Sequence, residues 1–155
     1  MKKKPFPTIG DQAPDFILKD QHNEEFRLSS LKGKKVVLSF HPLAWTSVCA
    51  KQMKSLSENQ HVLEKLNTVP VGISVDSVPC KRAWAKELRI ESMRLLSDFW
   101  PHGGVAALFG ILRDKDGFSE RANIVVGEDG IIIFFKRYDI PELPDVSEII
   151  GFLKK

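Results

Sequence analysis

The sequence predicts an α/β fold in which helices cover both faces of one mixed sheet. Two apolar runs rich in β-branched residues, 35–40 and 69–75, are typical of strands buried on both faces. Apolar residues at helical spacing follow each run, over 47–66 and from about Pro79. Glu128-Asp129-Gly130 lies between two further apolar runs and indicates a β-hairpin.

The order of these elements narrows the fold. A leading hairpin over 16–28 precedes the β-α-β unit, and a short helix over 105–109 follows it. The chain then continues with the hairpin over 122–135 and a last helix from Asp145, where Glu148 is expected to complete a capping box. Parallel strands need a crossover, which is almost always right-handed. A β-α-β unit followed by ββα predicts a thioredoxin-like fold with an N-terminal hairpin and an inserted helix.

Length and composition predict a single domain spanning residues 1–155. Hydrophobic residues make up 43% of the chain and charged residues 28%, which is normal for a soluble domain. The net charge of +3 is too small to give much support for binding of nucleic acid or membranes. No apolar run approaches the roughly 18 residues of a membrane span. Prolines rather than an apolar run follow Lys2-Lys3-Lys4, so we expect no export signal and a cytoplasmic location.

The two cysteines, Cys49 and Cys80, are the candidates for chemistry. A disulfide scaffold would carry more cysteines in a shorter chain, so both thiols are expected to be reduced at rest. The four histidines show no metal-ligand spacing with the cysteines. Because there is also no glycine-rich phosphate loop, we expect neither a metal nor a cofactor.

Cys49 follows a buried strand and lies in the first turn of the predicted helix, where backbone N–H groups and the helix dipole favour a thiolate. The dipole contributes about 0.3–1 kcal/mol, whereas one pKa unit corresponds to about 1.36 kcal/mol. A nearby cation is therefore needed. Arg121 begins the predicted antiparallel neighbour of the strand ending at His41, so we expect its guanidinium beside Cys49. Cys80 follows the parallel neighbour and is expected at the same sheet edge.

The segment Pro42-x-x-x-Thr46-x-x-Cys49, with Arg121 opening a later strand, resembles the signature of the peroxiredoxin (AhpC/TSA) family, and the similarity extends from Gly10 to the last helix. The chain is most similar to the short Q-type and one-cysteine-like subgroups. The resemblance implies a thiol peroxidase in which Cys49 attacks hydrogen peroxide or organic hydroperoxides and becomes a sulfenic acid. It also implies that Thr46 holds the peroxide, Arg121 stabilises the thiolate and the leaving oxygen, and Pro42 shields the sulfur.

Several positions depart from the family pattern. His41 stands where the family usually has Tyr or Phe; we expect it to fill the aromatic site, and tuning of Cys49 is the alternative. Gln52 stands where many relatives have Glu. Lys54 occupies the position of the nearby resolving cysteine of one bacterial subgroup, and the absence of a cysteine-bearing tail argues against the large-ring two-cysteine type.

Cys80 is the candidate resolving cysteine. Lys81 and Arg82 follow it at the start of a predicted helix, so its pKa is expected to be lowered. We expect Cys80 to condense with oxidised Cys49 to an intramolecular disulfide, which a thioredoxin-like protein then reduces. The alternative is that Cys80 takes no part and an external thiol resolves Cys49 directly.

Two other functions compete with this interpretation. A thioredoxin-type disulfide reductase needs Cys-x-x-Cys, but Thr46 and Gln52 occupy the positions three before and three after Cys49. A redox sensor or an oligomeric chaperone without significant peroxidase turnover is the second alternative. We expect a monomer or a homodimer, and Trp45 is a candidate contact for a second subunit or for the reductant.

Overall fold

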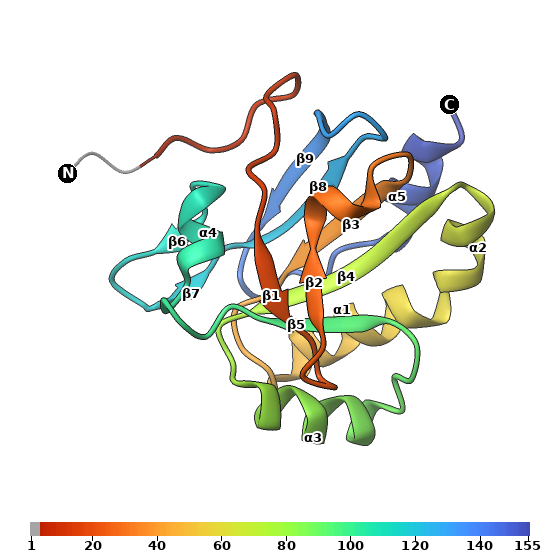
Figure 1. Cartoon of the computed structure of the whole chain (residues 1–155). Coiled ribbons are helices and arrows are strands. Elements are labelled where there is room, and N and C mark those ends of the chain that lie inside the picture. The colour runs from red at the N-terminus through yellow and green to blue at the C-terminus, as the bar shows by residue number, and fades with distance from the viewer. Residues whose placement is uncertain (1–3) are drawn as a thin grey trace.

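The computed structural model describes residues 4–155, so the first two N-terminal lysines lie outside the described residues. Strands and helices alternate along the chain and form one layered α/β unit (Figure 1). The elements are β1 (Ile17–Lys19), β2 (Glu25–Arg27), the 3-10 helix η1 (Leu28–Leu31), β3 (Lys35–Phe40), α1 (Ser47–Glu58), α2 (Gln60–Lys65), β4 (Thr68–Ser74), α3 (Val78–Leu88), β5 (Arg94–Ser97), α4 (Gly104–Leu108), β6 (Leu112–Arg113), β7 (Phe118–Ser119), β8 (Arg121–Val126), β9 (Ile132–Tyr138) and α5 (Val146–Leu153).

The main sheet has seven strands in the order β2-β1-β5-β4-β3-β8-β9. β3 pairs in parallel with β4 and antiparallel with β8, where Phe40 lies opposite Ala122. This arrangement confirms the predicted neighbours of the strand that leads to Cys49. The leading hairpin extends the same sheet, because Lys19 of β1 pairs with Ser97 of β5.

The two faces of the sheet bury separate apolar clusters. Along β3, Val36, Leu38 and Phe40 belong to one cluster and Val37 belongs to the other, as the alternation of a strand requires. Buried residues of α1, α2, α3 and α5 belong to the Val37 cluster, whereas α4 and the leading hairpin contribute to the other (Figure 1). The predicted layers, with helices on both faces of a mixed sheet, are confirmed.

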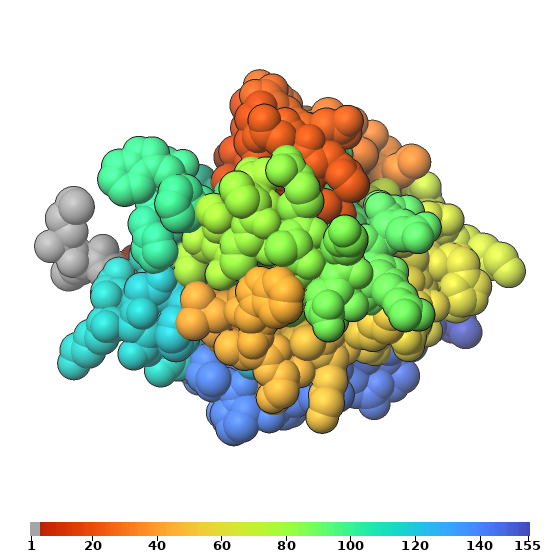
Figure 2. Space-filling view, turned by 90° about the horizontal axis from the view of Figure 1, so that it is seen from below, coloured from red at the N-terminus to blue at the C-terminus, as the bar shows by residue number. Residues whose placement is uncertain are grey.

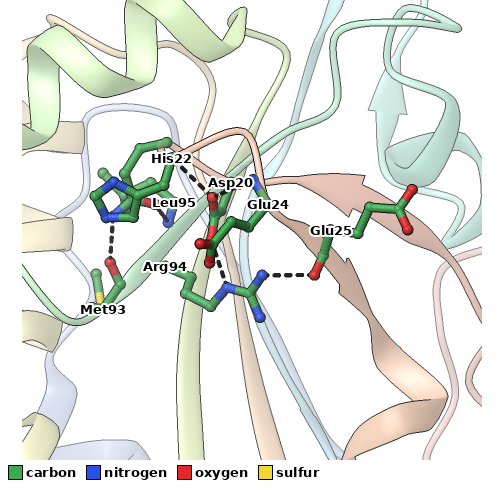
Figure 3. Close-up of polar contacts among 8 residues, drawn as sticks. Asp20, His22, Glu24, Glu25, Met93, Arg94 and Leu95 are labelled. Carbon is green, nitrogen blue, oxygen red and sulfur yellow. Dashed lines mark hydrogen bonds and ion pairs between the residues drawn. The ribbon is translucent and has the colours of Figure 1, made fainter.

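Polar contacts fasten the turn of the leading hairpin to β5 (Figure 3). The buried carboxylate of Asp20 accepts hydrogen bonds from Arg94 Nε at 2.8 Å and from the backbone N–H of His22 at 2.8 Å. The buried Gln21 side chain accepts from the N–H of Leu95 at 2.8 Å. These contacts hold the hairpin in the register that lets β1 continue the sheet.

The helix expected over 47–66 is two helices. α1 ends at Glu58 and α2 begins at Gln60, with Asn59 between them. The Asn59 backbone has a ψ of 8°, outside the helical range, and its side-chain amide donates to the Ser55 carbonyl at 2.8 Å. Asparagine competes for backbone hydrogen bonds in this way, which weakens a helix.

The predicted start of α5 at Asp145 is confirmed, but the predicted capping box does not form. Asp145 caps the helix, since its carboxylate accepts from the N–H of Ser147 at 2.9 Å. Glu148 does not complete the predicted capping box. Its carboxylate instead accepts from Lys136 Nζ at 2.6 Å and from the Tyr138 hydroxyl at 3.3 Å, both on β9. The tertiary contacts of β9 therefore replace the local one.

The small two-stranded sheet of β6 and β7 has no counterpart in the sequence prediction. Among the helices of residues 4–155, none combines the length and the apolar character that crossing a bilayer requires.

Candidate active site

The candidate site lies at the carboxyl end of β3, where a short loop leads into α1. His41 and Pro42 are buried, and the loop then turns at Trp45, whose φ of 68° lies in the left-handed region. Cys49 is the third residue of α1, and its side chain is fully buried. Thr46 is the residue before the helix, and its hydroxyl donates to the Leu43 carbonyl at 2.7 Å instead of capping α1.

Arg121 meets the Cys49 sulfur from β8. Its Nη1 donates to Cys49 Sγ at 3.3 Å and to Gln52 Oε1 at 2.7 Å, while Nε donates to the Ile140 carbonyl at 2.9 Å. Only 2% of Arg121 is exposed. Because three contacts fix the guanidinium in a buried position, its charge faces the sulfur with little competition from water. The structure brings these two residues together as expected from the strand order.

Gln52 holds the guanidinium from behind. Its amide nitrogen donates to Ser39 Oγ at 2.7 Å and to the Phe40 carbonyl at 3.2 Å, and Ser39 in turn donates to Asn123 Oδ1 at 2.7 Å. These side chains are buried. Since Gln52 is neutral, it orients Arg121 without neutralising its charge, and the guanidinium remains directed at the Cys49 sulfur.

A buried Lys81–His41 pair lies at the same end of the sheet. Lys81 Nζ and His41 Nε2 are 2.8 Å apart, and both residues are fully buried. The imidazole packs against the Trp84 ring with a centroid distance of 5.4 Å, so His41 occupies an aromatic environment. Burial lowers the pKa of His41 well below its ordinary value, and burial lowers the pKa of Lys81 to about 7.

Cys80 lies in the first turn of α3 and is partly buried. Its thiol donates to Asp76 Oδ1 at 3.7 Å, and Asp76 Oδ2 accepts from the N–H of Ala44 at 2.8 Å. The expected lowering of the Cys80 pKa is wrong: burial, and then the Asp76 carboxylate, raise it. The neighbouring cations do not offset this rise: Lys81 turns into the core and lowers the Cys80 pKa only as the smallest of the causes, and Arg82 donates to a carbonyl of the leading hairpin.

The Asp76 contacts join the two cysteine-bearing segments. Viewed from below, the start of α1 (orange) lies against the start of α3 (lime) on one face of the molecule (Figure 2). Both thiols are free, and Cys80 packs against the apolar cluster that contains Cys49. Within residues 4–155, no group of three or more His, Cys, Asp or Glu side chains is arranged to hold a metal ion.

Comparison with known proteins identifies the family. Residues 9–135 match the AhpC/TSA family. The chain belongs to this family. It is 35% identical over 139 residues to alkyl hydroperoxide reductase E of Mycobacterium tuberculosis, covering 89% of this chain and 90% of the relative. It is 34% identical over 156 residues to peroxiredoxin-1 of Gekko japonicus, covering 94% of this chain and 77% of that protein.

A solved structure agrees with the sequence comparisons. The reduced 2-Cys peroxiredoxin of Plasmodium vivax superimposes with a TM-score of 0.87 at 28% identity, covering 96% of this chain and 81% of that one. The chain is therefore a peroxiredoxin with a thioredoxin-like fold, and it acts as a thiol-dependent peroxidase. Its substrate is a hydroperoxide and its reductant is a thiol.

Two polar residues of this peroxiredoxin site, Lys81 and Asp76, were not singled out as site residues from the sequence. The buried positions of α3 recur at i, i+3 and i+4, namely Lys81, Trp84 and Ala85. Trp84 and Ala85 mark the apolar side of the predicted helix, and one turn back along it lies Lys81. The stripe is thus the signal for a buried lysine. No comparable signal marks Asp76, whose role depends on the loop contacts.

Proposed function

We propose that this peroxiredoxin reduces hydrogen peroxide and organic hydroperoxides with Cys49 as the attacking sulfur. The observation that carries the proposal is the 3.3 Å contact from Arg121 Nη1 to Cys49 Sγ inside a buried site. A guanidinium at this distance favours the thiolate over the thiol. The similarity to an alkyl hydroperoxide reductase supports organic hydroperoxides as substrates.

The proposed reaction is an in-line displacement at one peroxide oxygen. The Cys49 thiolate supplies the electron pair, the O–O bond breaks, and the sulfur becomes a sulfenic acid. The other oxygen leaves with the electrons of that bond and takes a proton to become water or an alcohol. Arg121 stabilises first the thiolate and then the charge on the leaving oxygen, which is how a fixed cation lowers a barrier.

Thr46 and Pro42 have supporting roles in this proposal. The exposed Thr46 hydroxyl, which now donates to the Leu43 carbonyl at 2.7 Å, reorients to hydrogen-bond the peroxide. Pro42 is buried and keeps water from the sulfur. Since Cys49 has no exposed surface, a peroxide contacts the sulfur only after the side chains of the loop before α1 move.

We further propose that Cys80 resolves the sulfenic acid. The thiol of Cys80 displaces the hydroxyl of oxidised Cys49, so a disulfide forms and water leaves. Support comes from the apolar cluster that both cysteines adjoin and from Asp76, which contacts Cys80 and the loop before Cys49. A disulfide requires the two Cα atoms to lie about 4.4–6.8 Å apart, and we expect the first turns of α1 and α3 to unwind to allow this.

The raised pKa of Cys80 has a kinetic consequence. Burial and the Asp76 carboxylate favour the neutral thiol in the reduced protein, whereas the thiolate is the attacking species. The low thiolate fraction of Cys80 therefore slows formation of the disulfide at neutral pH, and this step accelerates as the pH rises. A thioredoxin-like protein then reduces the disulfide and completes the cycle.

The test compares wild type, Cys49→Ser and Cys80→Ser in a peroxidase assay with a thioredoxin system. We expect no activity from Cys49→Ser. For Cys80→Ser we expect loss of thioredoxin-coupled turnover, while one equivalent of peroxide is still consumed. Activity in Cys49→Ser would contradict the assignment of the attacking sulfur.

Mass spectrometry of peroxide-treated protein tests the resolving step separately. A Cys49–Cys80 disulfide is the expected product. A lasting sulfenic acid or a mixed disulfide, without the internal link, would show instead that an external thiol resolves Cys49. The peroxidase assignment would survive that result, because it depends on Cys49 alone.

A further inference from the structure

Lys81 is a buried cation that the proposed peroxide chemistry does not use. Its ammonium has no exposed surface, and among residues 4–155 its one hydrogen-bond partner is His41 Nε2 at 2.8 Å. His41 Nδ1 lies 3.3 Å from the Ser39 carbonyl, which favours the tautomer with its proton on Nδ1. Nε2 is then the acceptor, and Lys81 is the donor. An ammonium with so few partners is costly to bury unless nearby negative charge compensates it.

The charged and titratable groups facing Lys81 come from four places. Cys49 is on α1, Asp76 precedes α3, and Cys80 is on α3 beside Lys81. His41 follows β3, and the charge of Arg121 on β8 contributes to the lowering of the His41 pKa. Burial lowers the pKa of Lys81 to about 7, and negative charge at Asp76, then at Cys49, and last at Cys80 when its thiol ionises, opposes that lowering.

Two of these negative groups differ in what happens to them during the reaction. The Asp76 carboxylate is fixed by the N–H of Ala44 and by the Ser74 hydroxyl at 2.6 Å, and it does not react. The Cys49 thiolate disappears whenever the sulfur is oxidised. The field at Lys81 therefore changes with the oxidation state of Cys49.

We propose that Lys81 is a positioning residue whose ammonium balances the Cys49 thiolate and which gives up its proton when Cys49 is oxidised. The inference depends on the proposed role of Cys49. In the net step, thiolate, ammonium and hydroperoxide become sulfenic acid, neutral amine and alcohol. The sulfur loses two electrons, the peroxide oxygens gain them, and the proton lost by Lys81 balances the one taken by the leaving oxide. The buried site thus contains the same net charge before and after oxidation.

The simpler alternative is that Lys81 only fills space. Its stem packs beside Trp84, with Nζ 5.3 Å from the ring centroid, and a neutral amine there would interact weakly with Cys49. In that case the protonation of Lys81 does not depend on the charge at position 49. The two interpretations therefore differ in whether the pKa of Lys81 depends on the charge at position 49, which can be measured.

The first experiment titrates Lys81 by NMR of isotope-labelled lysine in the reduced wild type and in Cys49→Ser, whose hydroxyl stays neutral. We expect the Lys81 midpoint to fall in the variant by about one pH unit, a tenfold change in proton affinity. Lys86 is exposed on the same helix and serves as the internal control, with no shift. An unchanged Lys81 midpoint would overturn the proposal.

The second experiment measures the reaction of Cys49 with hydrogen peroxide against pH in Lys81→Met, with Lys86→Met as the matched control. We expect the pH midpoint of Lys81→Met to rise by about one unit, so its rate at neutral pH falls roughly tenfold, while its plateau at high pH equals that of wild type. A purely structural role lowers the plateau and leaves the midpoint in place. The double variant His41→Phe/Lys81→Met, which retains an aromatic ring beside Trp84, provides a folded background if the single variant is unstable. A wild-type profile in a folded variant would refute the inference and leave the Cys49 assignment intact.

Discussion

The buried Lys81 ammonium makes the stability of the fold depend on pH in a defined direction. Burial lowers the pKa of Lys81 from its ordinary 10.5 to about 7. Between these values the unfolded chain binds a proton that the folded chain has released. Stability therefore rises with pH in this window, by up to about 1.4 kcal/mol per pH unit. Below the pKa of Lys81 in the folded protein, the free-energy cost of burying its ammonium is at its largest and no longer changes with pH.

Replacing Lys81 with Met removes this pH-dependent cost and keeps a long apolar side chain in the same space. We expect the free energy of unfolding of Lys81→Met to exceed that of wild type most at acidic pH. This difference should shrink by about 2–3 kcal/mol between about pH 7 and 9. Urea unfolding in the presence of a reductant, followed by tryptophan fluorescence, measures it. Lys86→Met, which alters an exposed lysine, should show a difference that is flat with pH. A flat difference for Lys81→Met, or one that grows with pH, would refute the reasoning.

Two further substitutions test the packing around the site. A Cβ added at Gly72 would overlap Met53 Sδ and lie 3.3 Å from His41 Cε1, so Gly72→Ala should lower the free energy of unfolding by about 1–3 kcal/mol; an unchanged urea midpoint would show that Met53 moves freely. Ser77 caps α3 by accepting from the N–H of Cys80 at 3.3 Å, so Ser77→Ala should destabilise the protein by about 1 kcal/mol. If α3 unwinds when the disulfide forms, Ser77→Ala should also speed that step in stopped-flow measurements, and a slower step would argue against unwinding.

The placement of Arg121 beside Cys49 follows from the sequence because it depends on topology alone. An antiparallel strand begins at the edge where its neighbour ends, so the first residue of β8 meets the end of β3. The distance between the two residues along the chain is irrelevant to this argument. Prediction was reliable here because the strands are strongly apolar and their order leaves few alternatives.

Predictions based on the charge or spacing of residues close together in the sequence were less successful. Lys81 was expected to lower the pKa of Cys80, but its ammonium faces the core and contacts His41, and its small effect on Cys80 is outweighed by burial and by Asp76. Glu148 matched the spacing of a capping box, yet Lys136 and Tyr138 on β9 attract its carboxylate. A side chain's partner is decided by the elements that pack around it, and local spacing contains no information about them.

The central claim is that Arg121 keeps Cys49 ionised, and the thiolate absorbance of Arg121→Met measures this directly. A hydrogen bond to a charged group contributes about 1.5–3 kcal/mol, which corresponds to a roughly ten- to hundredfold change in ionisation. We therefore predict that the thiolate fraction at neutral pH falls by this factor in Arg121→Met. The rate of reaction with hydrogen peroxide should fall by at least as much, because Arg121 also stabilises the leaving oxygen. Arg137→Met, an exposed arginine on the adjacent strand β9, should behave like wild type. A folded Arg121→Met protein with an unchanged thiolate fraction would contradict the account.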